Sequence, residues 1–156
     1  MPLEENEKSG KILLLDSSAI LNDFEFEFSP DTRYIMTPEC LAEIRDLRSR
    51  GLIENAFSQE LLSVKAPSAQ ALTEARGKAE ELGVRFSAAD QSLVALAIDF
   101  RSAGGDFKAV TDDYSLQNVL KALDLPFSGI IHGEITDVRD FSKRAKNSPK
   151  YGKKYP

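Results

Sequence analysis

The pattern that most constrains this chain is a run of four apolar residues, Ile12 to Leu15, that ends directly at Asp16. A continuous apolar run of this kind is typical of a strand buried on both faces of a parallel sheet. Further strand-like runs at 34–36, 61–64, 108–111 and 128–131 are separated by segments with helical features. Strands that alternate with helices predict βα units, so we expect an α/β domain built around a parallel sheet.

Helix boundaries are indicated by caps and by apolar spacing. Thr37-Pro38 combines an N-cap with a first-turn proline, so a helix is predicted from there to about Arg50. Ser17 can cap a short helix over 18–21, and the period-two pattern of 24–28 predicts a half-buried extended segment. Four more helices are expected, at about 53–59, 67–83, 87–103 and 116–123.

Length and composition fit one domain over residues 11–137, with a flexible N-terminus at 1–10 and a basic tail at 138–156. No stretch approaches the roughly eighteen apolar residues of a membrane helix, so no membrane partner is expected. The acidic N-terminus lacks the apolar core of a signal peptide, which favours a cytoplasmic location. The single cysteine, Cys40, excludes an internal disulfide and a cysteine-based zinc cluster.

Acidic residues stand at the ends of four different predicted elements: Asp16, Glu43, Asp90 and the pair Asp112-Asp113. Because the carboxyl ends of parallel strands form the ligand crevice of open α/β sheets, we expect these carboxylates to converge. Two carboxylates 4 Å apart repel by roughly 4 kcal/mol at an effective dielectric near 20, and a cation would relieve this. Hard oxygen donors suit Mg²⁺ or Mn²⁺, ions that support phosphodiester hydrolysis.

Each acid also has a structural explanation. Glu43 lies at the edge of an apolar stripe formed by Cys40, Ile44 and Leu47, and alone it would be a surface glutamate beside Arg50. Such a residue would need no metal. Only its combination with the other acids makes Glu43 a metal-site candidate.

Asp90 lies in line with the inward residues Leu93, Val94 and Ala97 of its helix, whereas Asp99 points outward as a surface acid. A capping box with Ser87 competes with a metal role for Asp90, and we favour the metal role because an inward carboxylate is costly without a partner.

The adjacent pair after the fourth strand-like run leaves the same choice open. Asp112 and Asp113 could form a turn and an N-cap, and we expect one of them to cap the following helix. Asp16 could likewise begin an Asx-type turn, although its position at a strand end favours the site. Two acids exceed what capping alone requires.

The C-terminal segment carries a charge opposite to the rest of the chain. Residues 143–156 hold six basic residues and no acid, so with a net charge of −5 the preceding residues sum to −11. Such a tail suits contacts with a polyanion, and a solubilising terminus explains it equally well. The candidate RNA-binding residues are Lys143, Arg144, Lys146, Lys150, Lys153 and Lys154.

These motifs resemble the PIN-domain ribonucleases. The pattern consists of Leu15-Asp16-Ser17-Ser18, the helix from Thr37 to Glu43, Ser87-x-x-Asp90 and Val110-Thr111-Asp112-Asp113. The stretch from Val110 to Asn118, supported by Glu43-Ile44-Arg45-Asp46, is more specific. It resembles the Nob-type endonucleases that mature the 3′ end of small-subunit ribosomal RNA, and the resemblance covers about residues 11–135.

The resemblance implies a three-layer fold and a metal-dependent endoribonuclease that hydrolyses single-stranded RNA. Asp16, Glu43, Asp90 and Asp113 would be the catalytic, metal-binding acids, with Asp112 as an accessory metal ligand. Ser18 would orient Asp16 or a metal-bound water. The expected partner is small-subunit pre-rRNA or a pre-ribosomal particle, and a homo-oligomer is left open.

Nob-type proteins usually continue into a cysteine-rich zinc ribbon, which is absent from this sequence. Three explanations stay open: a branch that lost the ribbon and uses the basic tail, a piece of a longer protein, or a stand-alone PIN protein with another RNA target. The alternatives at the level of function are a VapC-like toxin ribonuclease with an antitoxin partner and a non-catalytic RNA-binding or assembly module.

Overall fold

The computed structural model describes residues 11–131 and 134–136. The expected N-terminal segment 1–10, the expected tail 138–156 and its six candidate RNA-binding residues lie outside this part of the chain. Among the described residues, no helix is long and apolar enough to cross a membrane.

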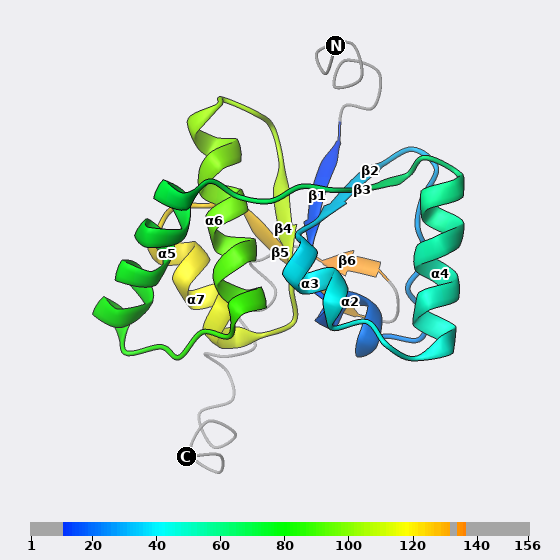
Figure 1. Cartoon of the computed structure of the whole chain (residues 1–156), viewed down its shortest axis with the longest axis horizontal. Helices are drawn as coiled ribbons and strands as arrows, with labels where there is room; N and C mark the ends of the chain where they lie inside the picture. The colour runs from blue at the N-terminus through cyan, green and yellow to red at the C-terminus, as the bar shows by residue number, and fades with distance from the viewer. Residues whose placement is uncertain (1–10, 132–133, 137–156) are drawn as a thin grey trace.

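A six-stranded sheet forms the centre of the molecule, in the order β3-β2-β1-β4-β5-β6 (Figure 1). The first five strands pair in parallel and β6 pairs with β5 in antiparallel fashion, which confirms the mostly parallel sheet. The antiparallel strand β6 was not predicted. The strands are β1 (Ile12–Leu15), β2 (Arg33–Met36), β3 (Leu62–Val64), β4 (Lys108–Val110), β5 (Phe127–Ile131) and β6 (Glu134–Thr136).

Helices cover both faces of the sheet and give the expected three layers. In Figure 1, α5, α6 and α7 gather on one side, α4 lies on the other, and α2 and α3 lie near the arrowhead of β1. The helices are α2 (Ser18–Leu21), α3 (Pro38–Ala42), α4 (Leu47–Ser58), α5 (Ala69–Leu82), α6 (Ala88–Ser102) and α7 (Tyr114–Ala122). The helices predicted at 18–21, 67–83, 87–103 and 116–123 are therefore present.

The strand β1 is central because all four of its side chains are apolar and buried. It pairs with β2 on one side and β4 on the other. The chain adds β2 and β3 on the first side of β1 and then crosses over to add β4 and β5 on the second side. Such a reversal of strand order is where open α/β sheets place their ligands. The amide of Asp16 continues the pairing by donating to the Val110 carbonyl at 3.0 Å, so the residues that follow β1 and β4 lie side by side.

The helical prediction between Thr37 and Gln59 was wrong in its boundaries. The helix that Thr37 caps ends at Ala42, and a new helix, α4, begins at Leu47 with Asp46 as its N-cap. The Asp46 carboxylate accepts from the Ser49 amide at 2.9 Å, which stabilises a helix start that the continuous pattern concealed. Leu47, assigned to the apolar stripe, is 90% exposed.

The predicted extended segment at 24–28 is a turn followed by irregular chain. Its period-two pattern has a different cause, because Phe26 is buried and Phe28 half-buried against the ring of Tyr34. The ring centroids of Phe26 and Phe28 lie 5.1 Å apart in an edge-to-face arrangement. Alternation here reflects an aromatic cluster without strand pairing.

Candidate metal centre at the carboxyl end of the sheet

The centre of the site is Asp16, which directly follows β1 and is only 4% exposed. Its Oδ2 accepts hydrogen bonds from the hydroxyls of Ser18 and Thr111, each at 2.8 Å. Burial raises the pKa of this carboxyl, and the two hydrogen bonds lower it in part. The charges of Asp90 and Glu43 then raise the pKa further. A buried carboxylate that feels two more acids is an electrostatically unfavourable arrangement that a cation would stabilise.

Glu43 reaches this region from the loop at the end of α3. It is the C-cap residue of that helix, and its Oε1 accepts a hydrogen bond from the Ser17 hydroxyl. The structure therefore places Glu43 beside the residue that follows Asp16, in place of the pairing with Arg50 considered from the sequence. Ser17 was expected to cap α2, and its side chain makes no such cap because it is turned toward Glu43.

Asp90 forms a capping box with Ser87, which was the less favoured of its two predicted roles. Its Oδ2 accepts from the Ser87 amide at 3.1 Å, while its own amide donates to the Ser87 hydroxyl at 3.0 Å. Asp90 is half-buried, and burial raises the pKa of its carboxyl, with further upward contributions from the charges of Asp113 and Glu43. The cap and the proximity to the other acids thus occur together, and capping alone does not explain the position.

Asp99 also differs from its prediction as an ordinary surface acid. It is half-buried, and its two carboxylate oxygens accept from the Ser68 amide at 2.6 Å and the Ser68 hydroxyl at 2.8 Å. Ser68 is the N-cap of α5, so Asp99 joins the start of α5 to α6.

The two adjacent acids after β4 have separate surroundings. Asp113 caps α7, because its Oδ1 accepts from the amides of Ser115 and Leu116 at 2.9 and 3.3 Å. Asp112 instead accepts from the Ile130 amide of β5 at 3.0 Å. Burial raises the pKa of Asp112, with Asp23 as the charged neighbour that contributes. Asp112 is therefore turned toward β5 and is not brought together with Asp16, Glu43 and Asp90.

The remaining four acids form one electrostatically connected set, which we call the acid cluster: Asp16, Glu43, Asp90 and Asp113. They come from the end of β1, the end of α3 and the starts of α6 and α7. Within the described residues, no three acidic, histidine or cysteine side chains are already arranged to hold a metal ion. Each carboxylate accepts a hydrogen bond from its own local partner, so the donor chemistry suits a hard cation while the side chains would have to turn toward it.

A buried polar seam, formed by the side chains of Thr37, Ser92 and Cys40, lies between α3 and α6. The hydroxyls of Thr37 and Ser92 are 2.6 Å apart, and Ser92 also donates to the Ala89 carbonyl at 2.8 Å. These bonds join the start of α3 to α6 and so fix two elements that carry acids. Cys40 lies in the same seam, and burial raises the pKa of its thiol to about 12, so this thiol stays protonated.

Two hydroxyl residues make hydrogen bonds to the acids that the sequence did not predict. Thr111 is fully buried, donates to Asp16 and accepts from the Asp113 amide at 3.1 Å, so it links two acids of the cluster. Ser17, which follows Asp16 in the sequence, donates a hydrogen bond from its hydroxyl to the carboxylate of Glu43. Thr111 is part of the motif Val110-Thr111-Asp112-Asp113. The sequence does not show that its side chain points inward from the end of β4 toward Asp16 at the end of β1.

Comparison with known proteins identifies the family. The family model described as "PIN domain of ribonuclease" matches residues 13–100, more than half of the chain. The chain belongs to the PIN-domain ribonucleases. The match includes three acids of the cluster, Asp16, Glu43 and Asp90, and its end at residue 100 precedes Asp113.

Relatives of this PIN domain carry two different names. It is 42% identical over 95 residues to ribonuclease VapC3 of Aeropyrum pernix, covering 60% of this chain and 68% of the relative. It is 31% identical over 127 residues to endoribonuclease Nob1 of Methanothermobacter thermautotrophicus, covering 80% of this chain and 71% of the relative. Against endoribonuclease Nob1 of Archaeoglobus fulgidus the identity is 33% over 132 residues, covering 83% and 74%.

Proposed function

We propose that this PIN domain is an endoribonuclease that depends on Mg²⁺ or Mn²⁺ and cuts single-stranded RNA. The observation that carries the proposal is the buried Asp16, whose charge is opposed by Asp90 and Glu43 from two other elements. A protein keeps such an arrangement at a cost to its stability. A role in binding a divalent cation accounts for that cost.

Asp16, Glu43, Asp90 and Asp113 are the residues that would hold the ion or ions. When bound, a divalent ion supplies an activated water and stabilises the charge that develops in displacement at phosphorus. The chain's own contribution is to fix the carboxylates: Ser18 and Thr111 hold Asp16, and Ser17 holds Glu43. Partners of this kind orient metal ligands and typically change metal affinity by about 10- to 100-fold when removed.

The natural substrate that we propose is the 3′ end region of small-subunit pre-rRNA, within or outside a pre-ribosomal particle. The likeness to the two Nob1 proteins supports this, because it extends over 80% and 83% of the chain. The likeness to VapC3 is shorter but higher in identity, and it supports the second candidate, a toxin ribonuclease with a small antitoxin partner. Co-purification of such a partner from the native source would favour the toxin.

A cleavage assay tests the nuclease. The wild-type chain is incubated with Mn²⁺ and an RNA that spans the 3′ end of small-subunit rRNA, beside Asp16→Asn and the matched control Asp106→Asn. Asp106 lies exposed in the loop before β4, so its variant loses the same charge outside the acid cluster. A discrete cut by wild type and control that disappears in Asp16→Asn supports a nuclease of this RNA. If Asp16→Asn cuts as well as wild type, or if no Mn²⁺-dependent cut occurs, the proposal is wrong.

The basic tail is proposed as an electrostatic arm for the RNA, since the acid cluster repels a polyanion. Deletion of residues 143–156 should weaken RNA binding and flatten its dependence on salt, because each phosphate contact to single-stranded RNA contributes about 0.7 to the slope. Fluorescence anisotropy over a range of salt concentrations measures both effects. An unchanged affinity and slope would exclude the arm while leaving the nuclease proposal untouched.

A further inference from the structure

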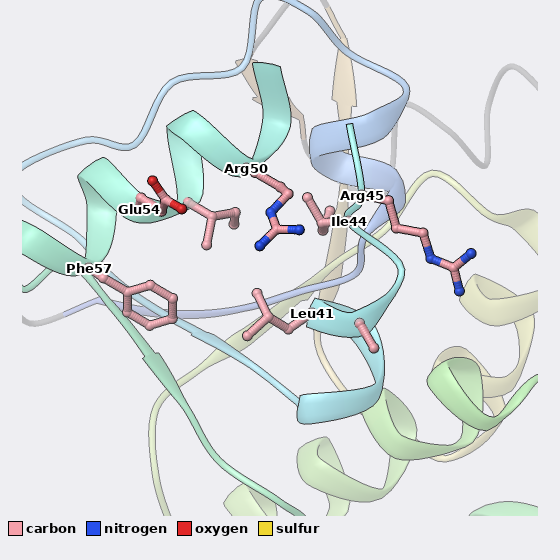
Figure 2. Close-up of a pocket in the computed structure, with 8 residues that line it drawn as sticks. Leu41, Ile44, Arg45, Arg50, Glu54 and Phe57 are labelled. Carbon is pink, nitrogen blue, oxygen red and sulfur yellow. The ribbon is translucent and has the colours of Figure 1, made fainter. Parts of the chain in front are cut away.

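A pocket of about 370 Å³ lies between the end of α3 and the side of α4 that carries Arg50, Ile53 and Phe57 (Figure 2). Its apolar lining comes from Leu41 and Ile44 on one side and from Ile53 and Phe57 on the other. Ile44 and Ile53 are nearly buried, at 6% and 5% exposed, whereas Phe57 remains 37% exposed. The pocket therefore offers an apolar floor with an accessible aromatic ring at its edge.

Two arginines flank this floor. Arg50 reaches from α4 into the pocket, and Arg45 extends from the loop between α3 and α4 (Figure 2). Within the described part of the chain, neither arginine makes an ion pair, although Glu54 also lines the pocket. Arg48, by contrast, is committed to the fold, since it donates to the Ile20 carbonyl at 3.0 Å and lies 4.5 Å from the centroid of the Phe24 ring. Arg45 and Arg50 are both exposed and are therefore accessible to an external anion.

The pocket adjoins the acid cluster through consecutive residues. Ala42, Ile44 and Arg45 line the pocket, while Glu43 between them turns toward Ser17 and the cluster. Neighbouring Cα atoms are about 3.8 Å apart, so the pocket and one member of the acid cluster are built on adjacent residues of the same loop. Single-stranded RNA, which is anionic along its length and carries flat apolar bases at intervals, would fit both surfaces.

We infer that this pocket receives one unstacked base of the RNA, with Phe57 against the base and Arg45 and Arg50 on the flanking phosphates. The inference rests on the proposed nuclease function and adds a binding subsite to it. Single-stranded RNA suits the site because bases stack on aromatic side chains while cations follow the backbone. A protein helix with acidic side chains would also use the apolar floor and the arginines, but the adjacent acid cluster favours RNA, which is the substrate of that cluster in the proposed function.

The test measures binding of a short fluorescein-labelled oligoadenylate to the full chain by anisotropy. Ca²⁺ replaces Mn²⁺ because it also binds carboxylates, and a gel verifies that the RNA stays intact. The variants are Phe57→Ala and Arg50→Gln. Their matched controls on α5 are Leu82→Ala, at a side chain 42% exposed, and Arg76→Gln, at an exposed arginine.

Phe57→Ala should weaken binding roughly fivefold or more, as expected for the loss of one stacked base, and should leave the salt slope unchanged. Arg50→Gln should lower the salt slope by about 0.7. Both effects should be absent from the α5 controls, and the Phe57→Ala effect should disappear with an abasic oligomer of the same length. A general folding defect would not weaken base-dependent binding in Phe57→Ala alone while lowering the salt slope in Arg50→Gln alone.

Binding by Phe57→Ala and Arg50→Gln that equals the controls would overturn the inference. So would unchanged RNA binding together with loss of a co-purifying protein from Phe57→Ala, since the pocket would then be a protein-docking site. Cleavage in Mn²⁺ is followed separately for each variant. If wild type cuts RNA and the pocket variants bind normally, the subsite fails alone; if nothing cuts, the nuclease proposal fails and the binding ratios still decide the subsite.

Discussion

The helices α6 and α4 lie on opposite faces of the sheet and differ sharply in how they are held. In α6, eight of fifteen residues are buried, and the helix packs against β1, β4 and the neighbouring helices. In α4, only Ser49, Ile53 and Ala56 of twelve residues are buried. The side of α4 that faces α3 borders the pocket described above. One helix is part of the core, whereas the other is a partly covered outer element.

This difference separates the two proposed tasks of the molecule. Asp16 directly follows β1, Asp90 lies in the first turn of α6 and Asp113 is the N-cap of α7, so the packed side of the fold positions three of the four acids. Glu43, Arg45 and Arg50 belong to the loop and helix of the less packed side. Carboxylates carried by packed elements suit a site that must gather its ligands around one cation, and an adaptable surface suits RNA of varying sequence.

The largest effect is expected from a cavity in the packed side. Leu96 of α6 is fully buried, so Leu96→Ala should reduce the free energy of unfolding by about 4 kcal/mol. Ile53 of α4 is also buried but borders the existing pocket, so Ile53→Ala should cost about 2 kcal/mol. Urea denaturation of both variants measures the difference, and an equal or reversed cost would contradict the comparison.

The adjacent acids after β4 give the second prediction. Asp113→Asn should reduce Mn²⁺-dependent cleavage by about a hundredfold or more. Removing a partner of a metal ligand typically costs about 10- to 100-fold in activity, and removing the ligand itself should cost at least as much. Asparagine still caps helices, so α7 should remain intact. Asp112→Asn should cut at nearly the wild-type rate, since the Asp112 side chain is turned to β5. Comparable losses from the two variants would return Asp112 to the metal site.

The same division explains how much of the fold the sequence could reveal. The helix α6 was predicted almost to the residue because a buried helix carries a long apolar run between a serine cap and Gly104. The helix α4 was misplaced because its surface needs few apolar residues, and exposed Leu47 falsely extended the stripe of α3. An apolar pattern in the sequence locates a helix reliably when the helix is largely buried, as α6 is. It is less reliable for α4, where few residues are buried.

The proximity of Asp16 to Asp112 and Asp113 was predictable, because these residues follow two neighbouring strands of a parallel sheet. The hydrogen-bond partners Ser17 and Thr111 were harder to predict, since small polar residues of this kind occur throughout loops and caps. Choosing between capping and metal binding for Asp90 was a false choice, because the side chain caps α6 at the same place where it approaches Asp113 and Glu43. Sequence spacing identifies an end of a helix but does not show what faces it.

The third prediction concerns Thr111, which connects Asp16 to Asp113 from within the packed side. Thr111→Val keeps the shape and removes a hydrogen bond to a buried carboxylate, so it should destabilise the protein by about 2 kcal/mol. It should also weaken Mn²⁺ binding by about tenfold. Thr111→Ser retains the hydroxyl and is the matched control for both denaturation and metal titration; a Thr111→Val protein that binds Mn²⁺ normally would remove Thr111 from the site.

The fourth prediction follows from the raised pKa of Asp16. Its ordinary value is near 3.8, so between that pH and its raised folded value the folded state holds more protons than the unfolded state. Stability of the metal-free protein should therefore fall as the pH rises through this window. Thermal unfolding in EDTA should show a decline of a few degrees in wild type that is smaller in Asp16→Asn. Identical slopes would mean that the Asp16 charge does not oppose folding.

The most direct test of the acid cluster is thermal unfolding during a titration with Mn²⁺ near neutral pH. A cation that binds only the folded state should raise the unfolding midpoint progressively, by an amount equivalent to about 2.7 kcal/mol at a hundred times the dissociation constant. The account predicts this rise for wild type and Asp106→Asn and a flat response for Asp16→Asn. A flat wild-type response, or an equal rise in Asp16→Asn, would contradict the assignment of the acid cluster as a metal centre.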